Sequence, residues 1–519
     1  MSLAVLASQA LCGLQGFAVR VEVHVGPGLP AFSLVGLPDT GVRESRERVR
    51  SAIISSGYEF PSGRITVNLA PADLPKESGR FDLAIALGVL AASGQLAIPS
   101  KEGGPADAPP DFCDYVFAGE LSLTGAVVPV AAPLAIALSV ARDAPEAALI
   151  LPAGCAGLAA HVPGLKVLAA GSLREVVDHF CAGSQLAPAQ AAARSVVRQA
   201  LSCMSDVRGQ ADARRALEIA AGGGHSLLMS GPPGAGKSML AHRLPGLLPA
   251  LSGQHALEVA AVAGLSGKEP VFSTLAPFRA PHHSASAPAL VGGGVRPKPG
   301  EISLAHHGVL FLDELPEFQR SVLESLREPL ETGCVSIARA SLTLTFPADF
   351  QLIAAMNPCP CGWLGHARMR CGCTPDRIDK YRARLSGPLL DRIDLQISLP
   401  AAEPTWLDET RGEASESIRR RVQKCREKQW ERQAGLNARL DVQGIERHCI
   451  LNQTARALMH EAMRRWSWSA RVVHRVLRVA RTLADMSESD DIDVVHLAEA
   501  ARYRQPWAEN RNGGPRPPL

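Results

Sequence analysis

Runs of apolar residues change character along the chain. Up to residue 183, short β-type runs alternate with alanine-rich helical runs. Residues 20–25 and 64–69 alternate polar and apolar positions as half-buried strands do, and residues 41–56 have the spacing of an amphipathic helix. The pattern predicts an α/β domain over residues 1–183.

The remaining pattern predicts two further domains. Residues 206–400 alternate helical segments with continuous apolar runs, which are typical of buried parallel strands. Residues 401–505 are predominantly helical in pattern and rich in Lys and Arg. We expect residues 184–205 to be a linker and the Gly- and Pro-rich residues 506–519 to be a disordered tail. The predicted fold class is therefore multi-domain α/β with a C-terminal helical lid.

Composition indicates a folded, soluble protein. Hydrophobic residues make up 46% of the 519 positions and charged residues 20%, which excludes disorder of the whole chain. A net charge of only +3 excludes a histone-like protein that binds by bulk charge. Gly, Pro and Ser interrupt the uncharged residues 83–100 and 121–141, so we expect strand–turn–helix units there and no membrane span. The N-terminus lacks the basic region of a secretory signal, so we expect a cytoplasmic protein.

A phosphate-binding loop is the clearest motif. Residues 231–238 match G-x-x-x-x-G-K-[ST], between the patterns of a buried strand and a helix. Backbone N–H groups of such a turn bind phosphates, its Lys reaches the β- and γ-phosphates, and its Ser ligates Mg²⁺. The predicted ATP-binding residues are Gly231, Pro232, Pro233, Gly234, Ala235, Gly236, Lys237 and Ser238.

Two further apolar runs end in polar residues suited to ATP hydrolysis. Residues 308–312 are followed by Asp313 and Glu314, and residues 352–356 by Asn357. We expect Asp313 to hold Mg²⁺, Glu314 to polarise the attacking water, and Asn357 to lie beside the γ-phosphate. The alternative for the acidic pair is a solvated turn.

This order of motifs resembles that of AAA+ ATPases. Arg392, in the segment LLDRIDL, is similar to the family's arginine finger, and Arg471, at the start of a C-terminal helix, is similar to its second sensor. The resemblance implies that Arg392 completes the ATP site of a neighbouring subunit in a homo-hexamer. The alternative is that either arginine is a helix-surface charge.

Two inserted segments refine the resemblance. One covers residues 277–300, and the alternating residues within 332–349 predict a β-hairpin with its tip near Arg339. Both are similar to pore-lining elements of the clade that contains magnesium chelatase and MCM helicases. This similarity makes Arg279 and Arg339 candidate DNA contacts, and the alternative is that both segments pack between subunits.

Long stretches resemble the ComM/YifB family of magnesium-chelatase-like proteins. The matching segments span most of residues 1–505 and include GLPDTGVRESRERVRSA, GQADARRALEIAAGGGHSLLMSGPPGAGKSMLA, FRAPHHSASAPALVGGG and SARVVHRVLRVARTLAD. The resemblance implies a hexameric, ATP-driven helicase that promotes branch migration when incoming DNA recombines in natural transformation. Its implied partners are single-stranded and branched DNA and recombination proteins.

The N-terminal domain resembles the catalytic domain of Lon protease, of the ribosomal protein S5 domain 2-like type. The similar segments are LPKESGRFD and GELSLTGAVVP. In an ungapped match, Arg80 takes the place of the nucleophilic serine and Leu134 that of the catalytic lysine, so neither can perform that chemistry. We expect a non-proteolytic domain that contacts DNA or assembles the ring. Its candidate phosphate contacts are Arg43, Arg46, Arg48, Arg50 and Lys76, and the alternative for the four arginines is a solvated helix face.

Four of the twelve cysteines lie close together, in two C-x-C pairs separated by nine residues. Cys359, Cys361, Cys371 and Cys373 suit a tetrahedral zinc site, although C-x-x-C spacing is the more usual signal. Unligated thiols and a redox switch are the alternatives. The adjacent histidines 282–283 and 306–307 are not expected to ligate a metal jointly, because neighbouring side chains of a strand point to opposite faces.

Besides an ATP-dependent protease, against which the missing Ser–Lys dyad argues, two other classes of function compete with the DNA motor. The first is a magnesium-chelatase-type subunit that remodels a protein partner. Asp485, Ser487 and Ser489 match the D-x-S-x-S string of a metal-ion adhesion site, but they follow a helical run and no strand. The second is a scaffold that binds ATP without turnover, against which the full set of predicted catalytic residues argues.

Overall fold

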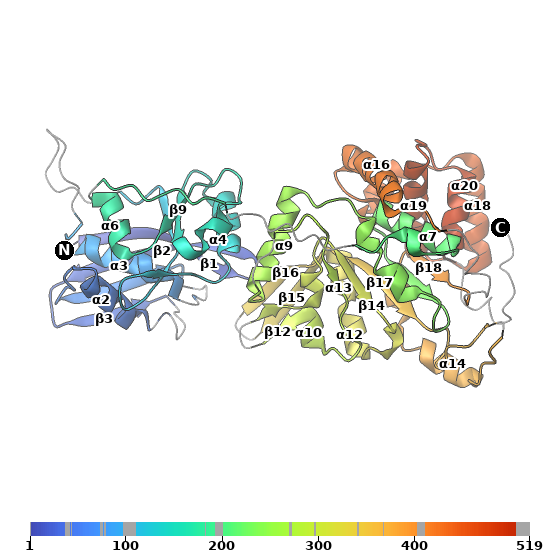
Figure 1. Cartoon of the computed structure of the whole chain (residues 1–519), viewed down its shortest axis with the longest axis horizontal. Coiled ribbons are helices and arrows are strands. Elements are labelled where there is room, and N and C mark those ends of the chain that lie inside the picture. Colours follow the sequence, from blue (N-terminus) through green and yellow to red (C-terminus); the bar gives the residue numbers. More distant parts are fainter. Residues whose placement is uncertain are drawn as a thin grey trace. The chain divides into compact units, whose positions relative to one another are not determined.

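A computed structural model describes residues 2–36, 42, 44–72, 76, 79–96, 111–181, 183–191, 201–268, 272–294, 297–339, 342–366, 368–401 and 411–504. The predicted tail at 506–519 and residues 192–200 of the predicted linker lie outside these ranges. The chain forms two units (Figure 1). The first unit comprises residues 1–196, 253–273 and 340–345, and the second comprises residues 197–252, 274–339 and 346–519.

A seven-stranded mixed sheet forms the centre of the first unit, in the order β3-β4-β2-β1-β5-β8-β9. Its strands are β1 (Ser2–Cys12), β2 (Gln15–Gly26), β3 (Ala31–Val35), β4 (Arg64–Ala70), β5 (Tyr115–Phe117), β8 (Ala148–Pro152) and β9 (Val167–Ala170). β1, β2 and β4 pair in antiparallel fashion, and the other neighbours run parallel. β2 and β4 contain the two strands that alternation predicts, and both predictions are confirmed.

Helices of the first unit bury mainly apolar faces. They are α2 (Ser45–Ser55), α3 (Asp82–Ala92), α4 (Pro133–Asp143), α5 (Ala153–Ala159) and α6 (Leu173–Cys181). The strand–turn–helix prediction for residues 83–100 is wrong, since the described part forms the almost wholly buried helix α3. Residues 121–141 contain the short strand β7 (Val127–Val128) before α4. No described helix is long and apolar enough to cross a membrane.

A segment from the middle of the chain also belongs to the first unit. The helix α9 (Gly253–Leu265) lies between two elements of the second unit in sequence. Its residues Leu257, Ala260 and Ala261 join a buried apolar cluster with Leu134 of α4. The first unit is therefore not a continuous stretch of sequence.

A five-stranded parallel sheet forms the centre of the second unit, in the order β11-β14-β17-β10-β18. Its strands are β10 (Leu227–Ser230), β11 (Phe278–Arg279), β14 (Val309–Leu312), β17 (Gln351–Met356) and β18 (Leu395–Ser398). β10, β14 and β17 are entirely buried, as their continuous apolar sequences predict. Because all strands run parallel, their carboxyl ends share one edge of the sheet.

Helices complete the second unit. The predicted helical character of its C-terminal part is confirmed, with α16 (Ser415–Gln433), α17 (Val442–His448), α18 (Gln453–Trp466), α19 (Ala470–Met486) and α20 (Val494–Arg502). Figure 1 shows these helices in orange and red near α7 (Ala211–Gly223). Leu227 and Ile353 of the sheet share one apolar cluster with Ala480 and Leu483 of α19. The helical part and the sheet therefore have a common core.

Candidate nucleotide site and cysteine cluster

The phosphate loop connects β10 to α8 (Lys237–Ala241) at the carboxyl edge of the sheet. Gly234 and Gly236 have φ values of +77° and +82°. Glycine adopts this left-handed region without steric cost, so the loop can turn its backbone N–H groups inward. Gln210, at the N-cap of α7, donates from Nε2 to the Ala235 carbonyl over 2.7 Å. The sequence interpretation did not include Gln210, and its place before a helix is the only signal.

Lys237 lies inside the phosphate loop and is only 9% exposed. Its Nζ donates to the carbonyls of Gly231 and Pro232 over 2.7 and 2.9 Å, and to Oδ1 of Asn357 over 3.1 Å. Burial lowers the pKa of Lys237, and the charge of Asp313 opposes this effect. The lysine thus joins the loop to the end of β17, where the sequence places the polar sensor.

Ser238 and Asp313 are in direct contact. The serine hydroxyl donates to Oδ2 of Asp313 over 2.6 Å. Asp313 directly follows β14, two strands from β10 in the sheet. The two expected Mg²⁺ ligands therefore lie at the same edge, with oxygen atoms of the kind that Mg²⁺ prefers.

Glu314 contacts a histidine from the inserted segment. Its backbone has a left-handed φ of 52°, and its N–H donates to Oδ1 of Asp313 over 2.9 Å. One carboxylate oxygen lies 3.1 Å from Nδ1 of His283. Sequence reasoning assigned no specific role to His283, because nothing local in the sequence connects it to Glu314.

The two histidine pairs do not lie as the sequence interpretation assumed. The ring centroids of His282 and His283 are 4.1 Å apart, and those of His306 and His307 are 3.8 Å apart. The expectation of opposite faces is wrong because both pairs occupy turns and neither lies in a strand. His306 accepts a hydrogen bond at Nδ1 from the Asp349 backbone N–H over 3.1 Å.

No contact within the described part of the chain joins either candidate arginine to the phosphate loop. Arg392 is 8% exposed, donates to the Pro388 carbonyl over 2.7 Å and pairs with Glu331 over 2.5 Å. Arg471 is exposed at the start of α19, whose N-cap Ser469 accepts from the Val472 N–H. Their roles in ATP turnover stay predictions.

The first inserted segment contains a short strand and a short helix. Residues 277–300 begin with the edge strand β11 and continue through α10 (Ala287–Val291). Arg279 lies in β11 and forms two hydrogen bonds with Glu301, of 2.5 and 2.6 Å. A DNA phosphate would have to displace the Glu301 carboxylate from Arg279. The DNA contact of Arg279 stays a prediction.

The hairpin prediction is confirmed by β15 (Cys334–Arg339) and β16 (Leu342–Pro347), which form a two-stranded sheet. Arg339 is the last residue of β15. Its side chain lies outside the described part of the structure, and its DNA contact stays a prediction.

Several basic side chains have structural partners within their own unit. In the first unit, Arg48 pairs with buried Asp82 over 2.6 Å, and Lys76 is fully buried and donates to the Pro71 carbonyl. Lys76 is therefore wrong as a candidate for phosphate contact, whereas Arg48 stays a prediction, with Asp82 as a competing partner. Arg43 lies outside the described residues, and Arg46 and Arg50 stay predictions. In the C-terminal part of the second unit, five more arginines form ion pairs with carboxylates: Arg421, Arg432, Arg439, Arg475 and Arg481.

Asp485, from the D-x-S-x-S string, is 3% exposed and lies near the end of α19. Arg432 and Arg481 approach its Oδ1 to 2.6 and 2.9 Å. Two guanidinium groups already neutralise this carboxylate, so the string does not form a metal-ion adhesion site here.

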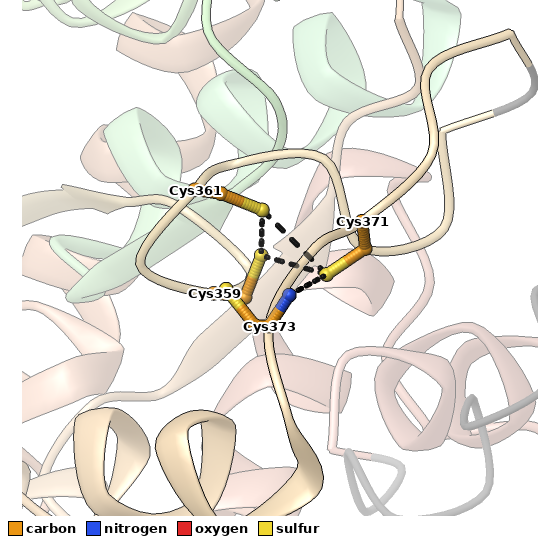
Figure 2. Close-up of side chains that lie close together, drawn as sticks. All are labelled: Cys359, Cys361, Cys371 and Cys373. Atoms are coloured by element: carbon orange, nitrogen blue, oxygen red, sulfur yellow. Dashed lines mark hydrogen bonds between the residues drawn. The ribbon is translucent and has the colours of Figure 1, made fainter.

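The four clustered cysteines lie together after β17 (Figure 2). The Sγ atom of Cys359 lies 3.4 Å from that of Cys361 and 3.7 Å from that of Cys371, and the latter two are 3.5 Å apart. The ligand atoms of all four, including Cys373, lie within 4.8 Å of one another. None of the chain's twelve cysteines, all of which are described, forms a disulfide. The cluster is compatible with a metal ion such as zinc.

Three family models match successive parts of the chain. A model described as "Magnesium chelatase, subunit ChlI" matches residues 203–407. "Subunit ChlI of Mg-chelatase" matches residues 21–154, and "Magnesium chelatase, subunit ChlI C-terminal" matches residues 412–504. The matches thus include the phosphate loop and the C-terminal helices.

Proteins similar over almost the full length extend this match. The chain is 46% identical to the competence protein ComM of Haemophilus influenzae, over 97% of this chain and 98% of that protein. It is 45% identical to the uncharacterized protein YifB of Escherichia coli, over 97% of each. A shorter match, 23% identical over 39% of this chain and 25% of the other, is to the maternal DNA replication licensing factor mcm6 of Xenopus tropicalis. The chain therefore belongs to the ComM/YifB family of magnesium-chelatase-like proteins.

Proposed function

We propose that the chain is an ATP-driven DNA motor that works in the cytoplasm as a homo-hexameric ring. It promotes branch migration while incoming DNA recombines with the chromosome, together with recombination proteins. One observation carries this proposal. Lys237, Ser238, Asp313 and Asn357 converge at one sheet edge, in a chain that matches the competence protein ComM along almost its whole length.

ATP turnover follows from the roles that these side chains can take. Lys237 would exchange the Gly231 and Pro232 carbonyls for the β- and γ-phosphates. Ser238 and Asp313 would hold Mg²⁺, which neutralises phosphate charge when bound. Glu314 would accept the proton of the attacking water, and Asn357 would orient that water.

The ring proposal concerns Arg392. In the single chain, its guanidinium group pairs with Glu331 and does not reach the described nucleotide site. In a ring, Arg392 would leave this partner and stabilise charge at the neighbour's γ-phosphate. The active site would then be complete only between subunits. Arg471 would contribute as a second sensor of bound nucleotide.

DNA would pass through the ring between the inserted segments. Arg279 and Arg339 are the proposed contacts, and both would bind phosphates without reading bases. Such binding releases counterions, so affinity would fall steeply as the salt concentration rises.

We also propose that the first unit is a Lon-like domain without protease activity. Leu134 is 1% exposed in α4, and an aliphatic side chain cannot replace a catalytic amine. The Lys76 ammonium already donates to the Pro71 carbonyl. The unit would instead contact DNA or assemble the ring.

A magnesium-chelatase-type remodeller of a protein partner is the second candidate. The three family models, all described as chelatase subunit ChlI, favour it. It would share the ATP chemistry but would not need DNA.

Steady-state ATPase activity with and without single-stranded and branched DNA tests the proposal. DNA should stimulate turnover, and Glu314→Gln should abolish it while ATP and DNA binding remain. ATPase activity that is indifferent to DNA would contradict the motor and favour the remodeller. Absence of turnover in wild-type protein would contradict both.

A further inference from the structure

We propose that Cys359, Cys361, Cys371 and Cys373 hold one zinc ion, and that this ion fixes the 357–373 loop against the phosphate loop. The four thiols come from two C-x-C pairs that the fold brings together (Figure 2). The metal site stands independently of the proposed ATPase. Its effect on nucleotide binding rests on that proposed function.

The sulfur atoms lie at the spacing of a tetrahedral site. Zn–S bonds of about 2.3 Å place tetrahedral sulfur ligands about 3.8 Å apart. The measured separations of 3.4, 3.5 and 3.7 Å are close to this value. A disulfide needs about 2.05 Å between its sulfurs, and a four-iron cluster holds its cysteine sulfurs much farther apart. Four protein ligands also close the coordination shell, as in structural zinc sites.

The loop lacks regular secondary structure that could order it. Its described residues, 357–366 and 368–373, contain no helix or strand. Loops of this length inside a domain are uncommon unless something else orders them. The Cys373 N–H donates a hydrogen bond of 3.5 Å to Cys371 Sγ, so the two cysteines of the second pair are in direct contact. A zinc ion bound by both C-x-C pairs would cross-link this loop and hold it in one conformation.

One side of the cysteine loop packs on the phosphate loop. Gly362 has a φ of +82°, and a Cβ built there would lie 2.6 Å from Cδ of Pro233. The backbone at Gly362 therefore lies too close to Pro233 of the phosphate loop for a Cβ to fit without a shift. Gly362 directly follows Cys361, so a metal bound to Cys361 would hold this contact in place.

The other side of the loop contains the sensor and its support. Asn357 accepts from Lys237 and lies two residues before Cys359. Arg382 in α14 (Pro375–Arg382) donates to the Pro358 carbonyl over 3.3 Å. A zinc ion at the cysteines would thus connect the end of β17 to the start of α14 and limit the movement of Asn357.

Metal content tests the site without any activity measurement. Full-length protein purified under reducing conditions should contain about one zinc ion per chain by plasma mass spectrometry. Cys361→Ser and Cys373→Ser should lose it, whereas Cys113→Ser, an exposed thiol outside the cluster, should keep it. Co²⁺ in place of zinc should show the visible absorption of a tetrahedral thiolate site. Wild-type protein with no metal or with iron, or cluster variants that keep zinc, would overturn the proposal.

A pair of glycine variants tests the link to the phosphate loop. Gly362→Ala and Gly365→Ala place alanine at similar φ values, +82° and +76°, but a Cβ at Gly365 meets no atom within 4 Å. Both should retain zinc. Gly362→Ala should weaken binding of a fluorescent ATP analogue by about tenfold, because its Cβ displaces Pro233. Gly365→Ala should bind the analogue like wild type.

The outcomes separate the two proposals. Equal nucleotide affinity in the two glycine variants would overturn the link, even with zinc bound. Zinc-containing wild-type protein that binds no nucleotide would refute the proposed ATPase and leave the metal site intact.

Discussion

The imidazole Nδ1 of His283 lies 3.1 Å from a carboxylate oxygen of Glu314. His283 comes from the inserted segment, whereas Glu314 follows β14 in the sheet. While the imidazole occupies this carboxylate oxygen, the attacking water cannot take its place there. A movement of the inserted segment would therefore change the rate of ATP hydrolysis.

His283→Ala should raise ATPase activity in the absence of DNA by about fivefold, since a hydrogen bond of ~1 kcal/mol no longer restrains Glu314. His282→Ala is the matched control, because His282 bonds Ser284 over 2.8 Å instead. Steady-state rates at saturating ATP measure both. A loss of activity in His283→Ala would mean that the histidine assists Glu314.

Mixing two inactive variants tests the proposed action of Arg392 between subunits. Arg392→Ala should bind ATP without turnover, and Lys237→Ala should fail to bind it. Mixed rings should recover part of the activity, because some interfaces then combine an intact phosphate loop with an intact arginine. No recovery would contradict the role in trans. Glu331→Gln, which only removes the ion-pair partner of Arg392, should remain active.

Arg279→Gln should weaken DNA binding and reduce the slope of log affinity against log salt by about one, as loss of one phosphate contact does. Glu301→Gln should strengthen DNA binding, since it releases Arg279 from its carboxylate partner. Fluorescence anisotropy across a salt series measures both. If the two variants lower thermal stability equally and leave DNA affinity unchanged, the arginine is structural.

Asp394 should contribute strongly to stability at neutral pH. It is 1% exposed and lies 2.8 Å from Arg475 and 3.3 Å from His225. Burial alone would raise its pKa, but the charge of Arg475 and the contacts with His225 lower it below the usual range. Asp394→Asn should reduce the free energy of unfolding by ~3–5 kcal/mol at pH 7.

The sign of the pH dependence follows from the lowered pKa. The stabilisation by Asp394 is complete above the unfolded-state pKa of about 3.9 and is lost as the pH falls through the lower folded-state pKa. The loss of stability that Asp394→Asn causes relative to wild type, measured by thermal unfolding, should therefore be constant from pH 7 to pH 5. It should shrink in stronger acid. Asp206→Asn breaks an exposed pair with Arg243 and should cost less than ~1 kcal/mol. A deficit that grows in acid would contradict the argument.

The centre of the nucleotide site could be predicted because its residues follow buried strands directly. Gly-rich turn residues mark the end of β10, and continuous apolar runs mark β14 and β17. Parallel strands bring their carboxyl ends to one edge, so Ser238 and Asp313 meet although 75 residues separate them. The local sequence pattern and the geometry of a parallel sheet were together sufficient to predict that these two residues lie close together.

Other parts of the fold and of the site depend on contacts that no local sequence pattern encodes. The meeting of His283 with Glu314 depends on the fold of a segment without strong periodicity, and the histidine pairs lie in turns that alternation rules do not describe. α3 is apolar on all sides, so its sequence lacks the periodicity that would distinguish it from strand and turn. The sequence pattern predicts no strand at Arg279, because β11 has only two residues and so shows no periodicity.

The helix α9 has a consequence for how this chain can be divided. Its apolar residues Leu257, Ala260 and Ala261 are buried with α4, although the chain on either side of residues 253–273 belongs to the second unit. A cut near residue 196 would leave these side chains without their apolar partners, and such a fragment should aggregate. Gene fusion or recombination near residue 196 could not transfer the complete first unit, because residues 253–273 would stay behind. The two units should therefore be inherited together.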